Sequence, residues 1–269
     1  MDFKLKYGDY ALITGASSGI GKEFAEQLAS KGLDLILVAR RKNRLDELAA
    51  SLQQKHKIKI KTVGIDLLES GALDKLVDAT KDLEIGLLIP NAGMETHGNF
   101  VENSLQTETD VQKLNTQIPM QLAHLFGAKM KSRKKGGIIF ISSTFGHQSV
   151  PFFANYAATK AYILSFGQAL NYELKQYNVD VTVLSPGLTK TEMAANMNDI
   201  DFKKMPITAM EVAPVVRKAI NALGKRQAVI SGTWNNTMDI MGKFMTPRWV
   251  LTNMFGFLIN RATIKNNFY

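Results

Sequence analysis

Short apolar runs alternate with longer amphipathic stretches along most of the chain. The runs are rich in Val, Ile and Leu, and Leu35-Ile36-Leu37-Val38 contains no polar position, which is typical of a strand buried on both faces. The runs predict strands at residues 10–14, 33–39, 60–65, 86–90, 137–142, 180–185 and 228–231.

The stretches between these runs have helical periodicity, for example at residues 22–31, 43–54 and 155–176. Repeated alternation of strand and helix predicts an α/β fold of the Rossmann type, a doubly wound parallel sheet of about seven strands with helices on both faces. We expect ligands beyond the carboxyl ends of the strands, where each motif described below falls.

The chain has 269 residues and no linker, repeat or low-complexity tract. We therefore expect one domain over residues 1–232, extended by an amphipathic C-terminal segment at residues 233–269. Residues 1–6 alternate charged and apolar side chains, so they are predicted to lead directly into the first strand and do not resemble a signal peptide. No apolar run is long enough for a transmembrane helix. The lack of cysteine excludes thiolate chemistry and fits a reducing compartment, so a cytoplasmic location is expected.

The net charge is +9, which raises the question of a nucleic-acid partner. A basic cluster precedes Gly136, at the expected end of a helix, where cations complement the helix dipole. The cluster comprises Lys129, Lys131, Arg133, Lys134 and Lys135. A solvated helix end explains it, so we expect no nucleic-acid partner.

The first strand leads into Thr14-Gly15-Ala16-Ser17-Ser18-Gly19-Ile20-Gly21, and a helix follows. Glycines permit a tight turn and a close approach of the backbone to phosphate, while the helix N-terminus supplies N–H groups for a pyrophosphate. A plain glycine turn is the alternative, but the strand before it and the helix after it favour a nucleotide site. The candidate residues are Gly15, Ser17, Ser18, Gly19, Ile20 and Gly21.

The spacing Gly-x-x-x-Gly-x-Gly after a threonine resembles the short-chain dehydrogenase/reductase family in its single-domain form. The resemblance extends from Lys6 to about Gly232 and implies a nicotinamide dinucleotide cofactor and a small-molecule carbonyl or alcohol substrate.

The second strand ends in Val38-Ala39-Arg40-Arg41. Relatives that prefer NAD usually carry an acidic residue at the position of Ala39, where it holds the ribose hydroxyls. Arg40 offers a bidentate, charge-assisted contact to a 2′-phosphate, with Arg41 or Ser17 assisting. A solvated basic run is the alternative. Because Ala39 stands in place of an acidic residue and Arg40 follows it directly, we predict NADP(H) as the cofactor rather than NAD.

The resemblance implies three further cofactor segments, each after a strand. Asp66 and Leu67 are similar to the pair that meets the adenine ring. Asn91, Ala92 and Gly93 match the family's Asn-Ala-Gly turn, in which Asn91 helps to fix the sheet edge. The segment from Pro186 and Gly187 to Thr191 resembles the one that holds the nicotinamide carboxamide, with Thr189 as a second candidate beside Thr191.

Tyr156 and Lys160 are four residues apart in a predicted helix and therefore share a face. A cation beside a phenol favours the phenolate, so we predict that Lys160 lowers the pKa of Tyr156 toward a useful range for acid–base catalysis. A surface tyrosine and lysine would be the alternative.

Ser143 lies thirteen residues before Tyr156, the separation found in the family, and it is preferred to the adjacent Ser142. Its hydroxyl can hydrogen-bond the substrate oxygen. Asn115 matches the family's fourth catalytic position, where an asparagine bends its helix and holds a water linked to the lysine. The resemblance implies that Tyr156 exchanges the proton while hydride moves between nicotinamide C4 and the carbonyl carbon. No metal is expected.

The substrate pocket is expected to be apolar and bordered by residues 94–100, 145–153 and 188–206. Its candidate residues are His97, His147, Phe152, Phe153, Met193 and Met197, although local packing is an alternative for each, and neither histidine is expected to be catalytic.

The C-terminal segment is predicted to form two short amphipathic stretches interrupted by Pro247 and Arg248. Packing against the domain or a twin subunit is the favoured interpretation. A lid over a lipophilic substrate or an anchor on an anionic membrane surface are the alternatives.

Together these features predict an NADP(H)-dependent oxidoreductase acting on a ketone or aldehyde, or on a secondary alcohol, with a lipophilic substrate. A catalytically silent nucleotide-binding regulator and a membrane-surface scaffold are the other candidates. A homo-oligomer is expected by analogy alone.

Overall fold

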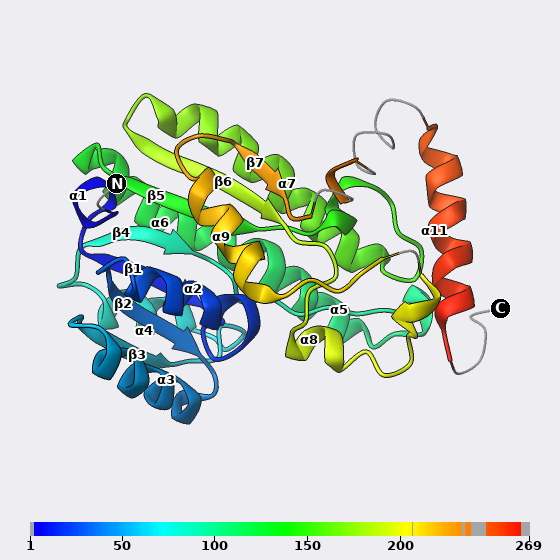
Figure 1. The fold of residues 1–269 in the computed structure, drawn as a ribbon, viewed down its shortest axis with the longest axis horizontal. Helices are drawn as coiled ribbons and strands as arrows, with labels where there is room; N and C mark the ends of the chain where they lie inside the picture. The colour runs from blue at the N-terminus through cyan, green and yellow to red at the C-terminus, as the bar shows by residue number, and fades with distance from the viewer. Residues whose placement is uncertain (1–2, 206, 233–234, 238–245, 265–269) are drawn as a thin grey trace.

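The computed structural model describes residues 3–205, 207–232, 235–237 and 246–264 (Figure 1). Its described strands form one seven-stranded sheet in the order β3-β2-β1-β4-β5-β6-β7, and each neighbouring pair is parallel. The strands are β1 (Tyr10–Thr14), β2 (Asp34–Ala39), β3 (Ile60–Gly64), β4 (Ile85–Ile89), β5 (Gly136–Ile141), β6 (Val179–Ser185) and β7 (Ala228–Ile230). The predicted doubly wound parallel sheet is confirmed.

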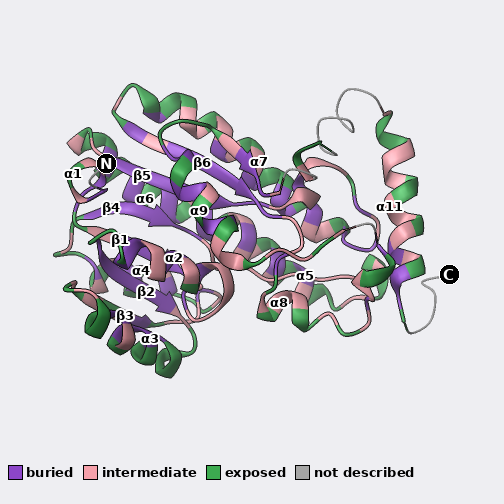
Figure 2. Ribbon diagram, viewed as in Figure 1, coloured by how far each residue is buried: buried purple, intermediate pink, exposed green. Residues whose placement is uncertain are grey.

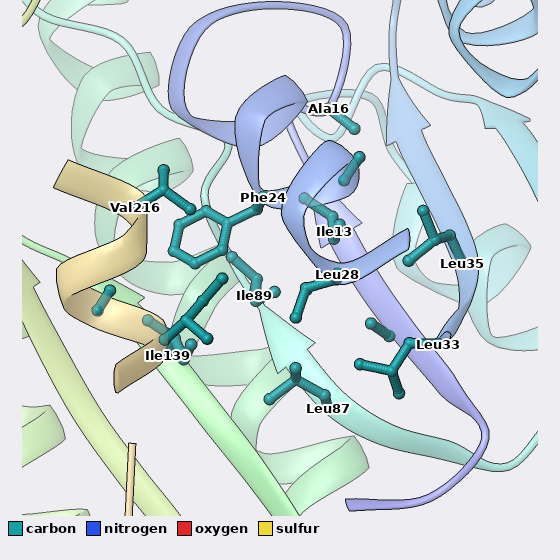
Figure 3. Close-up of a cluster of buried hydrophobic side chains, with 14 of the residues drawn as sticks. Ile13, Ala16, Phe24, Leu28, Leu33, Leu35, Leu87, Ile89, Ile139 and Val216 are labelled. Carbon is teal, nitrogen blue, oxygen red and sulfur yellow. The ribbon is translucent and has the colours of Figure 1, made fainter. Parts of the chain in front are cut away.

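Both faces of the sheet carry apolar side chains because successive residues of a strand point to opposite sides. In β1, Ala11 and Ile13 join one buried cluster and Leu12 joins the other. Figure 3 shows the Phe24 ring beside Val216 and Ile89 in the cluster on the first face, to which Ile13 also belongs.

The helices divide between these faces. The first face is covered by α2 (Gly19–Ala29), α3 (Lys42–Lys55) and α9 (Val212–Ala222). The second is covered by α4 (Ala72–Ala79), α6 (Ile118–Arg133) and α7 (Ala154–Lys175). The three helices predicted from periodicity are α2, α3 and α7, each within a few residues of the expected bounds.

The expectation that the first residues lead directly into a strand is wrong. They form a short helix, α1 (Phe3–Tyr7), before β1 begins. Phe3 and Tyr7 lie one turn apart, with ring centroids 5.3 Å from each other, and both are buried. The Tyr7 hydroxyl donates to Asp180 Oδ2 at 3.0 Å. Burial of two aromatic rings on one side therefore outweighs the alternating pattern.

A further layer lies beyond the carboxyl ends of the strands. It contains η1 (Phe100–Glu102), α5 (Leu105–Gln112), η2 (Lys113–Gln117), η3 (Thr144–His147), α8 (Glu192–Ala195), η4 (Phe202–Lys204) and α11 (Arg248–Ala262). Figures 1 and 2 show α11 at the end of the molecule far from the N-terminus.

The predicted interruption at Pro247 and Arg248 marks the start of α11. The predicted stretch before it falls mostly on residues 238–245, outside the described residues. Within the described ranges, no helix combines the length and apolarity needed to cross a bilayer.

Candidate active site

The turn between β1 and α2 is shaped by glycines. Gly15 and Gly19 have φ angles of +66° and +53°. A Cβ on Gly21 would lie 2.3 Å from the Gly15 carbonyl oxygen and 2.5 Å from Asn91 Nδ2. The backbone is thus packed too tightly for side chains at Gly21, and the turn leaves the start of α2 facing the cavity described below, which Gly15, Ser17, Ser18, Gly19 and Ile20 line.

The turn after β4 is joined to the end of β1. Asn91 Nδ2 donates to the Thr14 carbonyl oxygen at 3.0 Å, and the Ala92 N–H donates to Thr14 Oγ1 at 2.9 Å. Asn91 therefore holds two neighbouring strand ends together, as expected. A Cβ on Gly93 would lie 3.0 Å from Asn115 Oδ1 and 3.7 Å from Lys160 Nζ, so the absence of a side chain there leaves room for both groups.

The two arginines after β2 differ in their contacts. Arg41 donates to Ser17 Oγ at 3.1 Å and to Ser18 Oγ at 2.9 Å, and it forms an ion pair with Glu192 at 2.8 Å. Arg40 is 73% exposed, and its Nη1 lies 3.6 Å from Asp66 Oδ2. The arginine attached to the glycine turn is therefore Arg41, whereas the sequence favoured Arg40.

The remaining cofactor candidates also border the cavity. Asp66 Oδ1 accepts from the Leu68 N–H at 3.0 Å, and Leu67 is almost completely buried. Thr191 caps α8, and its side chain lies against Gly19. Thr189 instead donates to the Gly187 carbonyl oxygen at 2.9 Å, so Thr191 is the threonine that faces the glycine turn. Pro186 and Gly187 also line the cavity.

The side chain of Ser143 lies close enough to Tyr156 for its hydroxyl to oppose the rise in the pKa of the phenol. Ser143 follows β5, and Tyr156 lies in the first turns of α7. Ser142 Oγ instead donates to the Lys160 carbonyl oxygen at 2.6 Å, which ties the end of β5 to α7. The tertiary structure thus supports the choice of Ser143 over Ser142.

Lys160 is buried, with its Nζ 5.5 Å from the centroid of the Tyr156 ring and donating to the Ile141 carbonyl oxygen at 3.1 Å. Burial lowers the pKa of Lys160 to about 8. Burial also raises the pKa of Tyr156 to about 12. The Ser143 hydroxyl partly opposes this rise, and the charge of Glu95 adds to it. The prediction that Lys160 lowers the pKa of Tyr156 is wrong for this structure, because desolvation of the phenol dominates.

Asn115 lies in η2, a single π-helical turn between α5 and α6. Such turns often occur at functional sites. Asn115 Nδ2 donates to the Met94 carbonyl oxygen at 2.8 Å and to Thr159 Oγ1 at 3.1 Å, and its Oδ1 accepts from the Met94 N–H at 3.0 Å. The side chain therefore connects the segment after β4 to α7, next to Lys160.

One cavity of about 760 Å³ extends from the glycine turn to α11, and Ser143, Tyr156 and Lys160 line it, whereas Asn115 does not. At its far end the lining is mainly apolar. The lining residues there include Leu114, Phe145, Phe153, Met193, Met197, Phe202, Met205, Ile207, Leu251, Met254, Phe255 and Leu258.

Two predicted pocket residues do not line this cavity. His97 lies behind Phe153, with which its ring stacks at 5.5 Å, and Phe152 is buried in the cluster beneath α11. His147 does line the cavity, and its Nε2 lies 3.0 Å from Ser185 Oγ. The four α11 residues, Leu251, Met254, Phe255 and Leu258, are apolar positions of the C-terminal segment, for which a lid was one alternative, but the sequence did not assign them to the pocket. Within the described part of the chain, no cluster of side chains is suited to a metal ion.

Residues 9–201 match the short chain dehydrogenase family. The chain is also 34% identical over 235 residues to 7β-hydroxysteroid dehydrogenase from Clostridium sardiniense, covering 87% of this chain and 90% of the relative. The chain belongs to the short-chain dehydrogenase family and is an oxidoreductase, which confirms the resemblance found in the sequence.

Solved structures agree with this assignment. A structure from work on the stereoselectivity of 7β-hydroxysteroid dehydrogenase has a TM-score of 0.89 at 27% identity and covers 95% of this chain and 100% of its own. A short-chain dehydrogenase from Sphingobium yanoikuyae in complex with NADPH has a TM-score of 0.78 at 33% identity, with coverages of 88% and 95%.

Proposed function

We propose that this protein is an NADP(H)-dependent oxidoreductase that interconverts a lipophilic ketone or aldehyde with the corresponding alcohol. The observation that carries this proposal is that Ser143, Tyr156 and Lys160 line the same cavity as the glycine turn.

In this proposal the two hydroxyls polarise the substrate carbonyl, and Tyr156 gives its proton to the carbonyl oxygen. A phenol with a raised pKa stays protonated at neutral pH, so it is ready to act as the donor in reduction. Lys160 and Asn115 lie behind it and would position the phenol and resupply its proton. When bound, the nicotinamide supplies the hydride.

The residues present fit a dinucleotide. The tight glycine turn, the exposed start of α2 and the absence of a side chain at Gly93 leave room for a phosphate-bearing ligand along the strand ends. Asp66, Leu67 and Asn91 would border the adenine end, while Pro186, Gly187 and Thr191 would border the nicotinamide end.

A preference for NADP(H) is supported by two arginines near the ribose position and by Ala39 in place of an acid. Arg41 carries most of this proposal because Ser17 and Ser18 hold its guanidinium at the glycine turn. The NADPH complex of the Sphingobium relative is consistent with it.

A lipophilic substrate is supported by the apolar lining contributed by α11 and the segments before it. The hydroxysteroid activity of the relatives fits a bulky substrate of this kind. We further propose that residues 233–269 are an extension of the same domain, that α11 covers the cavity, and that the protein is cytoplasmic and homo-oligomeric.

Contact of α11 with a membrane surface is a secondary proposal. It is motivated by Trp249 and Phe257, which are 70% and 65% exposed, beside Arg248 and Arg261. Co-sedimentation with anionic liposomes that depends on residues 233–269 would support it, and equal sedimentation without them would exclude it.

The function is tested by mixing the protein with NADPH or NADH and a panel of small and bulky ketones. We expect NADPH consumption with bulky ketones, and a loss of roughly a hundredfold or more in turnover for Tyr156→Phe with NADPH binding retained. NADPH binding without turnover of any ketone or alcohol would favour the silent regulator instead.

A further inference from the structure

His97 lies between two carboxylates outside the cavity. Its Nδ1 is 3.0 Å from Glu95 Oε2, and its Nε2 is 2.9 Å and 3.0 Å from the two carboxylate oxygens of Asp199. The side chains of His97 and Glu95 are only 17% and 13% exposed. A neutral imidazole donates from one nitrogen, so two carboxylate contacts fit the doubly protonated imidazolium.

Asp199 belongs to residues 196–205, here called the substrate flap. Met197, Phe202 and Met205 of this flap line the apolar end of the cavity. The contact with His97 joins the flap to the segment after β4, although the two residues are 102 positions apart.

The flap is also bonded to the end of α11. The Asp201 N–H donates to the Ala262 carbonyl oxygen at 2.8 Å, and the Ile264 N–H donates to the Asp199 carbonyl oxygen at 2.8 Å. Ile200 and Thr263 form an antiparallel bridge between these bonds. Asp199 therefore connects His97 on one side with α11 on the other.

We propose that His97 is a positioning residue for carbonyl reduction: by pairing with Glu95 and Asp199 it holds the substrate flap and α11 closed over the bound substrate. This inference rests on the proposed function. His97 acts through the flap and does not touch the reacting atoms, because Phe153 stands between its ring and the cavity.

The contacts of His97 with Glu95 and Asp199, here called the clasp, depend on pH because of the charges around His97. The hydrogen bond to Glu95 is the main cause that raises the pKa of His97 to about 9; burial opposes it, and Asp199 adds to it. Glu108 of α5 borders the same segment through Thr96 at 3.0 Å and Asn103 at 2.7 Å, and Tyr156 of α7 feels the charge of Glu95. A raised pKa means that the clasp is intact at neutral pH and is lost as the pH rises through about 9.

The test compares His97→Gln and Asp199→Asn with the parent enzyme, and with His124→Gln as a control on an exposed position of α6. We expect KM for a bulky ketone to rise about tenfold in both variants, with kcat and the Kd for NADPH nearly unchanged. In the parent enzyme KM rises above pH 9, whereas in His97→Gln it is already high at pH 7 and does not change further. A KM for His97→Gln equal to that of the parent, or a pH-dependent KM retained in it, overturns the proposal.

Two measurements on the same proteins do not require turnover. Amide hydrogen exchange at Asp201 and Ile264 should be faster in Asp199→Asn than in the parent, and NMR titration should give His97 a pKa well above the ordinary histidine value of 6.5. Unchanged exchange, or an ordinary pKa for His97, overturns the clasp. If both hold while no ketone or alcohol reacts, the clasp stands and the proposed function is what has failed.

Discussion

At the nucleotide end of the cavity, the groups that face it come from strand ends and from the turns directly after them. Gly15, Asn91 and Thr14 are fixed by backbone packing and by short hydrogen bonds between neighbouring strands. At the substrate end, α11, the substrate flap and the segment after β4 meet through contacts between distant parts of the chain. The shape of the first region therefore depends on backbone geometry. The shape of the second depends on side chains, which can be substituted without altering the sheet.

The largest effect is expected where backbone packing is tightest. Gly21→Ala places a Cβ 2.3 Å from a carbonyl oxygen that cannot move away easily. We expect the free energy of unfolding to fall by about 3 kcal/mol and NADPH binding to be lost, as measured by denaturant titration and by fluorescence.

Gly127→Ala in α6 is the matched control. The new Cβ would lie at ordinary distances of 3.8 Å and 4.0 Å from the side chains of Ile138 and Leu174. It should be neutral or slightly stabilising. Equal destabilisation by the two substitutions would contradict the role given to the glycine turn.

Lys160 lies where the two regions of the cavity meet. Lys160→Met tests whether burying its ammonium group lowers the free energy of unfolding. Burial lowers the pKa of Lys160 from 10.5 to about 8, so between these values the unfolded chain binds a proton that the folded chain does not. The stability of the parent protein therefore rises with pH across this window.

Removing the amine should raise the free energy of unfolding by about 2 kcal/mol at pH 7, with the gain fading above pH ~10, while turnover is lost. Lys175→Met, on the exposed end of the same helix, is the control, and its free energy of unfolding should stay within about 0.5 kcal/mol of the parent at each pH. A Lys160→Met protein less stable than the parent at pH 7 would refute this account.

A smaller effect is expected at the ribose position. Arg41→Ala should weaken NADPH binding about tenfold and leave NADH binding nearly unchanged, because in the proposed binding mode Arg41 would contact the 2′-phosphate. Arg40→Ala should have less effect, since Arg40 is 73% exposed and contacts Asp66. Calorimetric Kd values for the two cofactors measure both; a larger loss for Arg40→Ala would restore the assignment favoured by the sequence.

The smallest effect is expected at α11, where the shapes of the side chains, and not the backbone, determine how a substrate fits. Phe255 lines the cavity and packs against Phe145 with ring centroids 6.4 Å apart. Phe255→Ala should raise KM about fivefold for bulky ketones but not for small ones, with little change in stability. Phe257→Ala, on the exposed side of the helix, should leave both KM values unchanged.

Local patterns in the chain were enough to predict the sheet, the glycine turn and the Tyr156–Lys160 pair. Each depends on a periodicity or on a spacing of a few residues, which backbone geometry converts directly into position. The choice of Ser143 over Ser142 also followed from spacing, and in the structure Ser143 lines the cavity with Tyr156 while the Ser142 hydroxyl donates to the Lys160 carbonyl oxygen.

Only the tertiary structure decided which arginine meets the glycine turn, which way the pKa of Tyr156 shifts, and that His97 joins two segments far apart in the chain. Desolvation and contacts between distant residues depend on the packing of the whole chain. No local pattern encodes them, so the arrangement of the substrate end follows only from the folded chain.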